Sequence, residues 1–169
     1  MKKLNLFKEK ADFSKVSLVI SDFDGVMTDG KVEISEQGFE SVTCSRLDGI
    51  GVKLLKNNGI DVIILSSEAN KSVEHRAKKL NITAHTNVLD KLEFIKNIQS
   101  KKSISSDEIF YIGDEINDLA VMKNLIHTAC PKDANSEIKK VAKYLLKRKG
   151  GNGVIREVSE LICLDKKWQ

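Results

Sequence analysis

The most restrictive feature of the chain is a pair of aspartates placed directly after a short apolar run. The run 16–20 is rich in β-branched residues and is followed by turn residues, so it predicts a buried strand. Asp22 and Asp24 then lie at the carboxyl end of that strand, where open α/β sheets bind their ligands. Oxygen ligands held there suit Mg²⁺. An Asx-turn after the strand is the purely structural alternative.

The rest of the chain alternates apolar runs with amphipathic segments. Apolar runs predict further strands over 62–66, 107–113 and 127–130, with a short extended piece at 86–88. Asp48 as N-cap and Gly59 as stop bound one predicted helix, and helices are also expected over 70–80, 91–98, 118–122, 136–147 and 154–162. The runs 31–34 and 40–43 flank turn residues and predict a β-hairpin. We therefore expect a single α/β domain over 1–169, a Rossmann-like parallel sheet covered by helices on both faces.

Composition excludes several classes of protein. No apolar stretch reaches membrane-span length, and the N-terminus lacks a signal-peptide pattern, so no membrane partner is expected. Three cysteines without metal-type spacing indicate a reducing, cytoplasmic location. The net charge is +4, and the basic residues clustered over 139–149 predict a solvated helix face. Aromatic residues make up only 5% of the chain and show no interleaving with basic residues that would suggest base stacking, so we expect no nucleic acid partner, while an anionic substrate suits the charge.

A polar cluster follows each predicted strand, and these clusters should meet at one sheet edge. Ser66 follows the second long strand, residues 113–118 follow the third, and Lys91 opens a helix between them. Ser66, Lys91 and the Gly25 amide are suitable phosphate donors. A carboxylate approaches a phosphoryl group only when cations neutralise the charge. The constellation therefore indicates an aspartate nucleophile that forms an aspartyl-phosphate.

Four segments, in order, resemble the motifs of the haloacid dehalogenase superfamily: 22–30, Ser66, Lys91 and 113–118. This resemblance implies a Mg²⁺-dependent phosphohydrolase in which Asp22 attacks phosphorus. Asp24 would then act as general acid and base.

The same resemblance implies the metal site. Asp22, the Asp24 carbonyl and Asp114 would bind the metal. Asp118 and Asn117 would hold these ligands in place, with direct binding of the metal by Asp118 as an alternative.

Spacing between these motifs indicates the branch of the superfamily. Only 44 positions separate Asp22 from Ser66, and 25 separate Ser66 from Lys91, which leaves no room for a covering cap domain. The segments 28–30, 48–51, 90–92 and 147–157 are similar to phosphatases of 2-keto-3-deoxy sugar acid biosynthesis. That similarity implies a homotetramer whose hairpins meet at the centre, with a Gly-rich tail that reaches a neighbouring site.

One departure bears on the substrate, which should be an anionic sugar-acid phosphate. Octulosonate 8-phosphate phosphatases usually carry Thr-Gly-Arg where this chain has Ser66-Ser67-Glu68. An acid at the third position resembles the nonulosonate (sialic acid or KDN type) 9-phosphate branch, in which it works with basic residues corresponding to Arg76 and Lys79. We therefore predict a nonulosonate 9-phosphate substrate, with octulosonate 8-phosphate as the alternative. Ordinary surface ion pairs would also explain these three residues.

Two functions of other classes remain as alternatives. One is a non-catalytic tetramerisation module, related to the phosphatase-like C-terminal domain of acylneuraminate cytidylyltransferases. The other is a phospho-receiver domain, which also gathers acids, a hydroxyl and a lysine around Mg²⁺. In that class, however, an adjacent acid pair ends the first strand, whereas this chain has Asp22-Phe23-Asp24.

Overall fold

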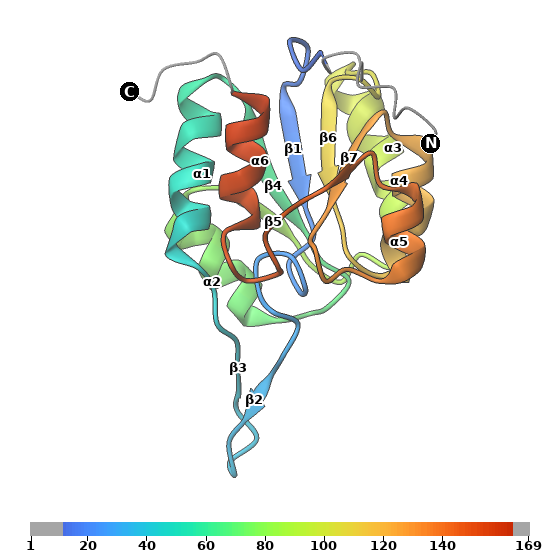
Figure 1. Cartoon of the computed structure of the whole chain (residues 1–169). Helices are drawn as coiled ribbons and strands as arrows, with labels where there is room; N and C mark the ends of the chain where they lie inside the picture. Colours follow the sequence, from blue (N-terminus) through green and yellow to red (C-terminus); the bar gives the residue numbers. More distant parts are fainter. Residues whose placement is uncertain (1–11, 164–169) are drawn as a thin grey trace, which may run out of the picture.

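The computed structural model describes residues 12–163, which form a parallel sheet between two layers of helices (Figure 1). The six strands are ordered β5-β4-β1-β6-β7-β8, and every neighbouring pair is parallel. Their bounds are β1 Leu18–Ser21, β4 Asp61–Leu65, β5 Thr83–His85, β6 Ile109–Ile112, β7 His127–Cys130 and β8 Tyr144–Leu145. The predicted α/β class is confirmed.

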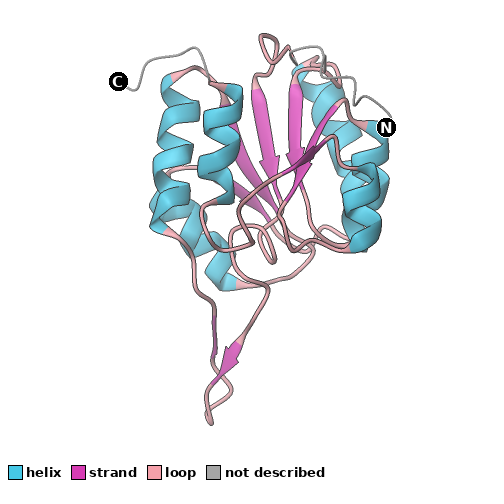
Figure 2. Ribbon diagram, viewed as in Figure 1, coloured by secondary structure: helices cyan, strands magenta, loops and turns pink. Residues whose placement is uncertain are grey.

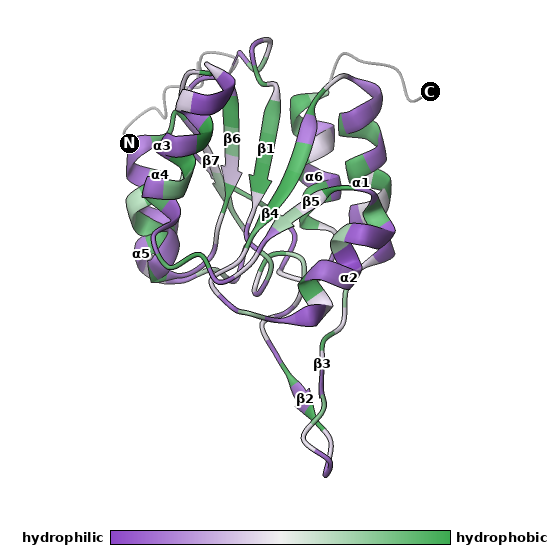
Figure 3. Ribbon diagram, turned by 180° about the vertical axis from the view of Figure 1, so that it is seen from behind, coloured by the Kyte–Doolittle hydropathy of each residue, from purple (hydrophilic) through white to green (hydrophobic). Residues whose placement is uncertain are grey.

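Helices cover both faces of the sheet (Figure 2). One layer holds α1 (Arg46–Asn57), α2 (Lys71–Leu80) and α6 (Val154–Ile162); the other holds α3 (Lys91–Lys102), α4 (Leu119–Asn124) and α5 (Ser136–Val141), with the short 3₁₀ helix η1 (Ile116–Asp118) before α4. Along β1, Val19 packs into the first layer's core while Leu18 and Ile20 pack into the second's. This burial on both faces explains why the strands are continuous apolar runs in the sequence. Figure 3 shows those runs concentrated in β1 and β4.

The predicted hairpin is present and projects from the body beyond the carboxyl ends of the strands (Figure 1). It consists of β2 (Glu33–Ile34) and β3 (Glu40–Ser41), paired antiparallel. Three apolar side chains on it are exposed: Val32 at 46%, Ile34 at 69% and Phe39 at 75%. Apart from this hairpin, only α1 lies between β1 and β4, so no cap domain is inserted there.

The predicted helix over 136–147 is wrong in its second half. α5 ends at Val141, and the chain then becomes extended and adds β8 to the sheet edge. Leu146 donates its N–H to the Cys130 carbonyl at 3.0 Å and buries its side chain in the core. Edge pairing and burial therefore override the helical pattern, and the basic residues after 142 do not lie on a helix face. The extended piece predicted at 86–88 is instead β5, three residues earlier.

The prediction that Asp48 is the N-cap of α1 is wrong. Ser45 takes that role and accepts the N–H of Leu47. Asp48 is instead buried in the first turn, where its Oδ1 accepts the Ile155 N–H at 2.9 Å. Ile155 lies in the first turn of α6, whose own N-cap is a glycine without a side chain. The carboxylate of one helix therefore caps another. Burial raises the pKa of Asp48 to about 6, against the opposing effects of the Ile155 N–H and Arg76.

This shift predicts how stability depends on pH. Because the folded-state pKa of Asp48 lies above the ordinary value, the folded protein keeps a proton at a pH where the unfolded chain has lost it. The contribution of Asp48 to the unfolding free energy is therefore complete below about pH 4 and is gone above about pH 6. Relative to Asp48→Asn, which cannot titrate, the wild-type unfolding free energy should fall by about 3 kcal/mol between these limits. Urea denaturation of both proteins over this range measures it.

Asp61→Asn, at an exposed position of β4, is the matched control and should keep a nearly constant offset from wild type. A pH-independent offset between wild type and Asp48→Asn would show that Asp48 titrates normally in the fold.

Candidate active site

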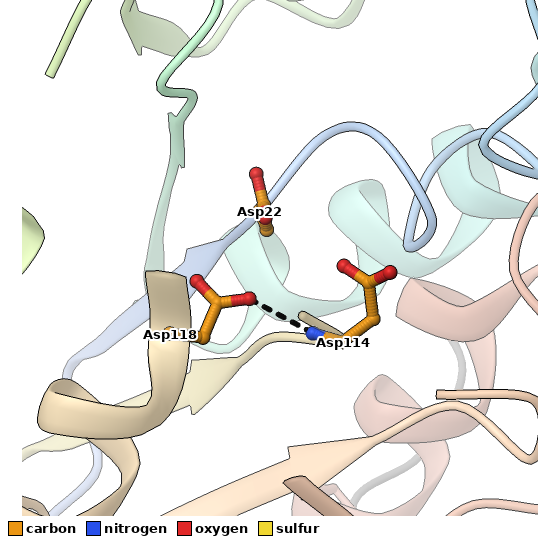
Figure 4. Close-up of side chains that lie close together, drawn as sticks. All are labelled: Asp22, Asp114 and Asp118. Carbon is orange, nitrogen blue, oxygen red and sulfur yellow. Dashed lines mark hydrogen bonds between the residues drawn. The ribbon is translucent and has the colours of Figure 1, made fainter. Parts of the chain in front are cut away.

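Acidic side chains from two strand ends converge at the carboxyl edge of the sheet. Asp22 follows β1 directly, while Asp114 and Asp118 follow the neighbouring strand β6. Carboxylate oxygens of these three residues lie within 4.8 Å of one another. Figure 4 shows the three side chains around one space, with the Asp114 N–H bonded to Asp118. The predicted sheet-edge acid cluster therefore exists, and Asp118 is part of it.

Lys91 is a buried cation between two of these acids. Its Nζ lies 2.8 Å from Asp22 Oδ2 and 2.7 Å from Asp118 Oδ1, and its side chain has no exposed surface. Asp90 caps α3 by accepting the Glu93 N–H, which places Lys91 in the first turn facing the cluster. Burial lowers the pKa of Lys91, but the two carboxylates outweigh burial and raise it. The ammonium therefore stays charged.

Asp118 has partners at both carboxylate oxygens. Oδ1 accepts from Lys91 and from the hydroxyl of buried Tyr111 at 2.5 Å. Oδ2 accepts the N–H groups of Asp114 at 2.9 Å and Glu115 at 3.2 Å. Asp118 is thereby fixed and in turn fixes the loop that carries Asp114. The contribution of Tyr111 is invisible in the sequence, because nothing in a buried strand pattern marks its hydroxyl as part of a site.

Asp114 has a different environment. Its Oδ1 is buried and has no hydrogen-bond partner among residues 12–163. Burial and the Asp118 charge raise the pKa of Asp114 to about 7. Gly25, at φ +78°, makes this approach possible, because a Cβ there would lie 1.9 Å from Asp114 Oδ2. The loop after β1 and the Asp114 side chain are therefore in direct contact.

The cluster fits a divalent cation. When Asp22, Asp114 and Asp118 are ionised, Lys91 alone leaves two negative charges uncompensated. Burial and the Asp118 charge raise the pKa of Asp22 well above its ordinary value, although Lys91 opposes this shift. The unpartnered oxygen of Asp114 is available as a ligand, whereas the oxygens of Asp118 are already bonded. Oxygen-only donors of this kind favour Mg²⁺ or a similar hard ion.

Asp24, the predicted general acid and base, is half-buried beside Thr28. The Thr28 hydroxyl donates to Asp24 Oδ1 at 3.5 Å and accepts the N–H groups of Gly25 and Gly30 at 3.3 and 3.2 Å. Burial and the nearby Glu68 charge raise the pKa of Asp24, which suits a proton donor. The Gly25 N–H, predicted as a phosphate donor, thus bonds to Thr28. Thr28 organises this loop, although the sequence singled it out only as part of a motif.

Ser66, the predicted phosphate donor after β4, is buried and accepts the Glu68 N–H at 3.1 Å. Its neighbour Ser67 accepts from Asn117 Nδ2 at 3.2 Å, which joins the loops after β4 and β6. Asn117 therefore supports the site through Ser67.

The predicted substrate residues are more dispersed. Glu68 is exposed at the site rim. Arg76 donates through Nη2 to the Ser45 carbonyl at 2.6 Å, at the junction of hairpin and α1. Lys79 is exposed in the last turn of α2. Within the described part of the chain, no hydrogen bond or ion pair joins Glu68 to Arg76 or Lys79, so their joint action stays a prediction.

The Gly-rich segment 150–153 lies against its own chain: Gly151 donates its N–H to the Val26 carbonyl at 3.0 Å. Whether the tail also reaches a neighbouring subunit stays a prediction, and residues 164–169 lie outside the described part.

Two further observations concern the cysteines and the length of the helices. No disulfide joins the three cysteines, of which Cys130 and Cys163 are buried and Cys44 is half-buried. In the range 12–163, none of the helices combines the length and apolarity needed to cross a bilayer.

Comparison with known proteins identifies the family. A model described as haloacid dehalogenase-like hydrolase matches residues 85–158. The 3-deoxy-D-manno-octulosonate 8-phosphate phosphatase KdsC of Yersinia pestis is 34% identical over 152 residues, which cover 89% of this chain and 81% of that protein. The chain therefore belongs to the haloacid dehalogenase-like hydrolases, and it is a phosphoric monoester hydrolase.

Solved structures agree with this assignment. A crystal structure of the Yersinia pestis octulosonate 8-phosphate phosphatase has a TM-score of 0.86 at 33% identity, covering 90% of this chain and 83% of that one. The Moraxella catarrhalis enzyme, in complex with magnesium ion, phosphate ion and KDO, also has a TM-score of 0.86, at 29% identity, covering 90% and 88%.

Proposed function

We propose that this enzyme hydrolyses 3-deoxy-D-manno-octulosonate 8-phosphate, with Asp22 as nucleophile. The observation that carries the reaction is the buried Asp22–Lys91–Asp118 network beside Asp114, and the similarity to octulosonate phosphatases supports the substrate. These relatives favour the octulosonate alternative over the nonulosonate prediction, which depended on Glu68.

The first half of the reaction transfers the phosphoryl group to Asp22. Lys91 at Oδ2 and the Phe23 N–H at Oδ1, 2.7 Å away, orient the attacking carboxylate. As the new bond to phosphorus forms, the bond from phosphorus to the sugar oxygen breaks, and Asp24 gives its proton to that oxygen. The raised pKa of Asp24 keeps this proton available.

The second half releases phosphate. Asp24, now ionised, takes a proton from water as the water oxygen attacks phosphorus, and the bond between phosphorus and Asp22 breaks. Asp22 and Asp24 thus return to their starting states. Ser66 and Lys91 are the proposed donors to the phosphoryl oxygens.

A divalent cation, proposed to be Mg²⁺, would be held by Asp22, Asp114 and the Asp24 carbonyl. When bound, it neutralises charge so that an anionic phosphoryl group can approach the nucleophile. The protein's own contribution is to present these oxygens in fixed positions through Asp118 and Gly25.

The first experiment tests catalysis and substrate together. Asp22→Asn keeps the shape but removes the attacking charge, so kcat should fall by about 10⁴-fold or more, roughly 5 kcal/mol of barrier. The wild type should prefer octulosonate 8-phosphate over a nonulosonate 9-phosphate by about tenfold in kcat/KM, a difference of about 1.4 kcal/mol in transition-state binding.

Initial rates of phosphate release, with Asp61→Asn as the exposed-aspartate control, measure both. A preference for the nonulosonate 9-phosphate would favour that substrate instead. An Asp22→Asn variant with kcat within about tenfold of wild type, a change of only about 1.4 kcal/mol in the barrier, would rule out Asp22 as the nucleophile.

Metal binding can be measured without turnover. Because a ligand that binds only the folded state stabilises it, saturating Mg²⁺ should raise the wild-type Tm by several degrees, with roughly 2.7 kcal/mol expected at a concentration about 100 times Kd. Asp114→Asn loses one ligand charge and should show a much smaller shift. An equal shift in both proteins would place the cation elsewhere.

We also propose that the chain forms a homotetramer through its hairpins. An isolated two-stranded hairpin is marginal in water, yet this one projects with Val32, Ile34 and Phe39 exposed. A second copy of the same apolar surface is a suitable partner. A neighbour's hairpin would then supply walls for the capless site.

Sedimentation tests this assembly. The wild type should be a tetramer, and Ile34→Ser with Phe39→Ser should shift it to smaller species without loss of secondary structure. Leu145→Ser, at an apolar residue that is 59% exposed on β8, is the matched control and should leave the tetramer intact. A monomeric wild type would refute the assembly.

A further inference from the structure

The Gly150–Gly151 segment makes close backbone contacts with the loop that carries the proposed nucleophile. Gly151 donates its N–H to the Val26 carbonyl at 3.0 Å. A Cβ on Gly150 would lie 2.2 Å from the Gly25 carbonyl oxygen and 2.8 Å from the Thr28 carbonyl oxygen. No side chain fits between the two backbones.

The same loop is confined on another side by the acid cluster. A Cβ on Gly25 would overlap the Asp114 carboxylate, at 1.9 Å from Oδ2. The backbone at Gly25 is therefore in contact with Asp114 through its Cα and with Gly150 through its carbonyl. Displacement of either neighbour would shift Asp24, which directly precedes Gly25, and Asp22, which lies two positions before Asp24.

Asp133 holds the Gly150 side of this arrangement. Its Oδ1 accepts the Gly150 N–H at 2.9 Å. Asp133 lies in the loop after β7, where Asn135 donates its backbone N–H to the Asp114 carbonyl at 2.8 Å and its Nδ2 to Glu115 Oε1 at 2.8 Å. One short loop therefore contacts both the Asp114 loop and the glycines behind the nucleophile loop.

We propose that Gly150 and Asp133 are positioning residues for phosphoryl transfer, which together set the place of the Asp22–Asp24 loop relative to Asp114. Neither residue touches the substrate. Their effect is on geometry, to which such reactions are sensitive: a displacement of about 1 Å can cost about 100-fold in rate.

Gly150→Ala tests this directly, with Gly49→Ala as its matched control. Neither glycine has a positive φ, so alanine is compatible with both backbones, and the variants differ in what the new methyl meets. At position 150 it meets the Gly25 backbone at 2.2 Å, whereas at position 49 it meets only the flexible end of Leu80 at 3.2 Å. With p-nitrophenyl phosphate as substrate, Gly150→Ala should lower kcat by about tenfold to 100-fold and change KM by less than about threefold, while Gly49→Ala stays near wild type.

A second pair of variants decides the matter if Gly150→Ala does not fold. Asp133 is exposed, so its replacement leaves the core intact. Asp133→Ala removes the acceptor of the Gly150 N–H and should lower kcat by about fivefold to tenfold, and Asp133→Asn, whose amide oxygen accepts the same N–H, should restore most of it.

A folded Gly150→Ala protein with kcat within about twofold of wild type, an effect below about 0.4 kcal/mol, would overturn the proposal. So would an Asp133→Asn variant as impaired as Asp133→Ala, or an Asp133→Ala variant as active as wild type. The inference depends on the proposed roles of Asp22 and Asp24, but the aryl substrate makes it independent of the sugar. An active Asp22→Asn variant would contradict the proposed roles of Asp22 and Asp24. An inactive Asp22→Asn variant together with a fully active Gly150→Ala variant would contradict only the positioning role of Gly150.

Discussion

The site depends on one buried interaction, in which the Lys91 ammonium lies between the carboxylates of Asp22 and Asp118 at 2.8 and 2.7 Å. Removing three charged groups from water is costly, and their attraction offsets that cost only when the remaining hydrogen bonds are satisfied. These remaining hydrogen bonds are made here. The Phe23 N–H donates to Asp22, and Asp118 accepts from the Tyr111 hydroxyl and from two N–H groups of the loop after β6. The network therefore joins the segments after β1 and β6 to α3 through charge, and as a consequence it positions Asp22, the proposed nucleophile.

Close backbone approach is the second constraint on the site. Gly25, Gly113 and Gly150 each leave no room for a side chain: at Gly113 a Cβ would lie 2.5 Å from Asp118 Cγ. At these three positions the loops pack directly against one another, without intervening side chains. In a phosphatase without a cap domain, this packing gives the acid groups fixed positions while the substrate side stays open. Walls around the proposed sugar-acid substrate would then come from the rim or, in the proposed tetramer, from another subunit.

Secondary structure was predictable where burial on both faces made strands into apolar runs and where helix faces were regular. β7 and α6 have the predicted bounds, and β4 differs from its prediction by one residue at each end. β8 was missed because a two-residue edge strand carries no periodic signal, and it forms only where β7 offers its free edge. Asp48 was misassigned because an aspartate near a helix start is a good cap for its own helix, whereas its partner, Ile155, is 107 positions away.

The sequence by itself determined the order of the strands and helices along the chain, the Asp-x-Asp pair at a strand end and the residue types of the acid, hydroxyl and ammonium groups. These are local properties, because periodicity and turn chemistry act over a few residues. Only the tertiary structure decided that β6 lies beside β1, which brings Asp114, Asp118 and Tyr111 to Asp22. It also decided that the segments around Asp133 and Gly150 pack behind the loop that carries Asp22 and Asp24. Such contacts join residues about 20 to 125 positions apart, and their free energy depends on which strands become neighbours, a choice made by the whole core and by no single segment.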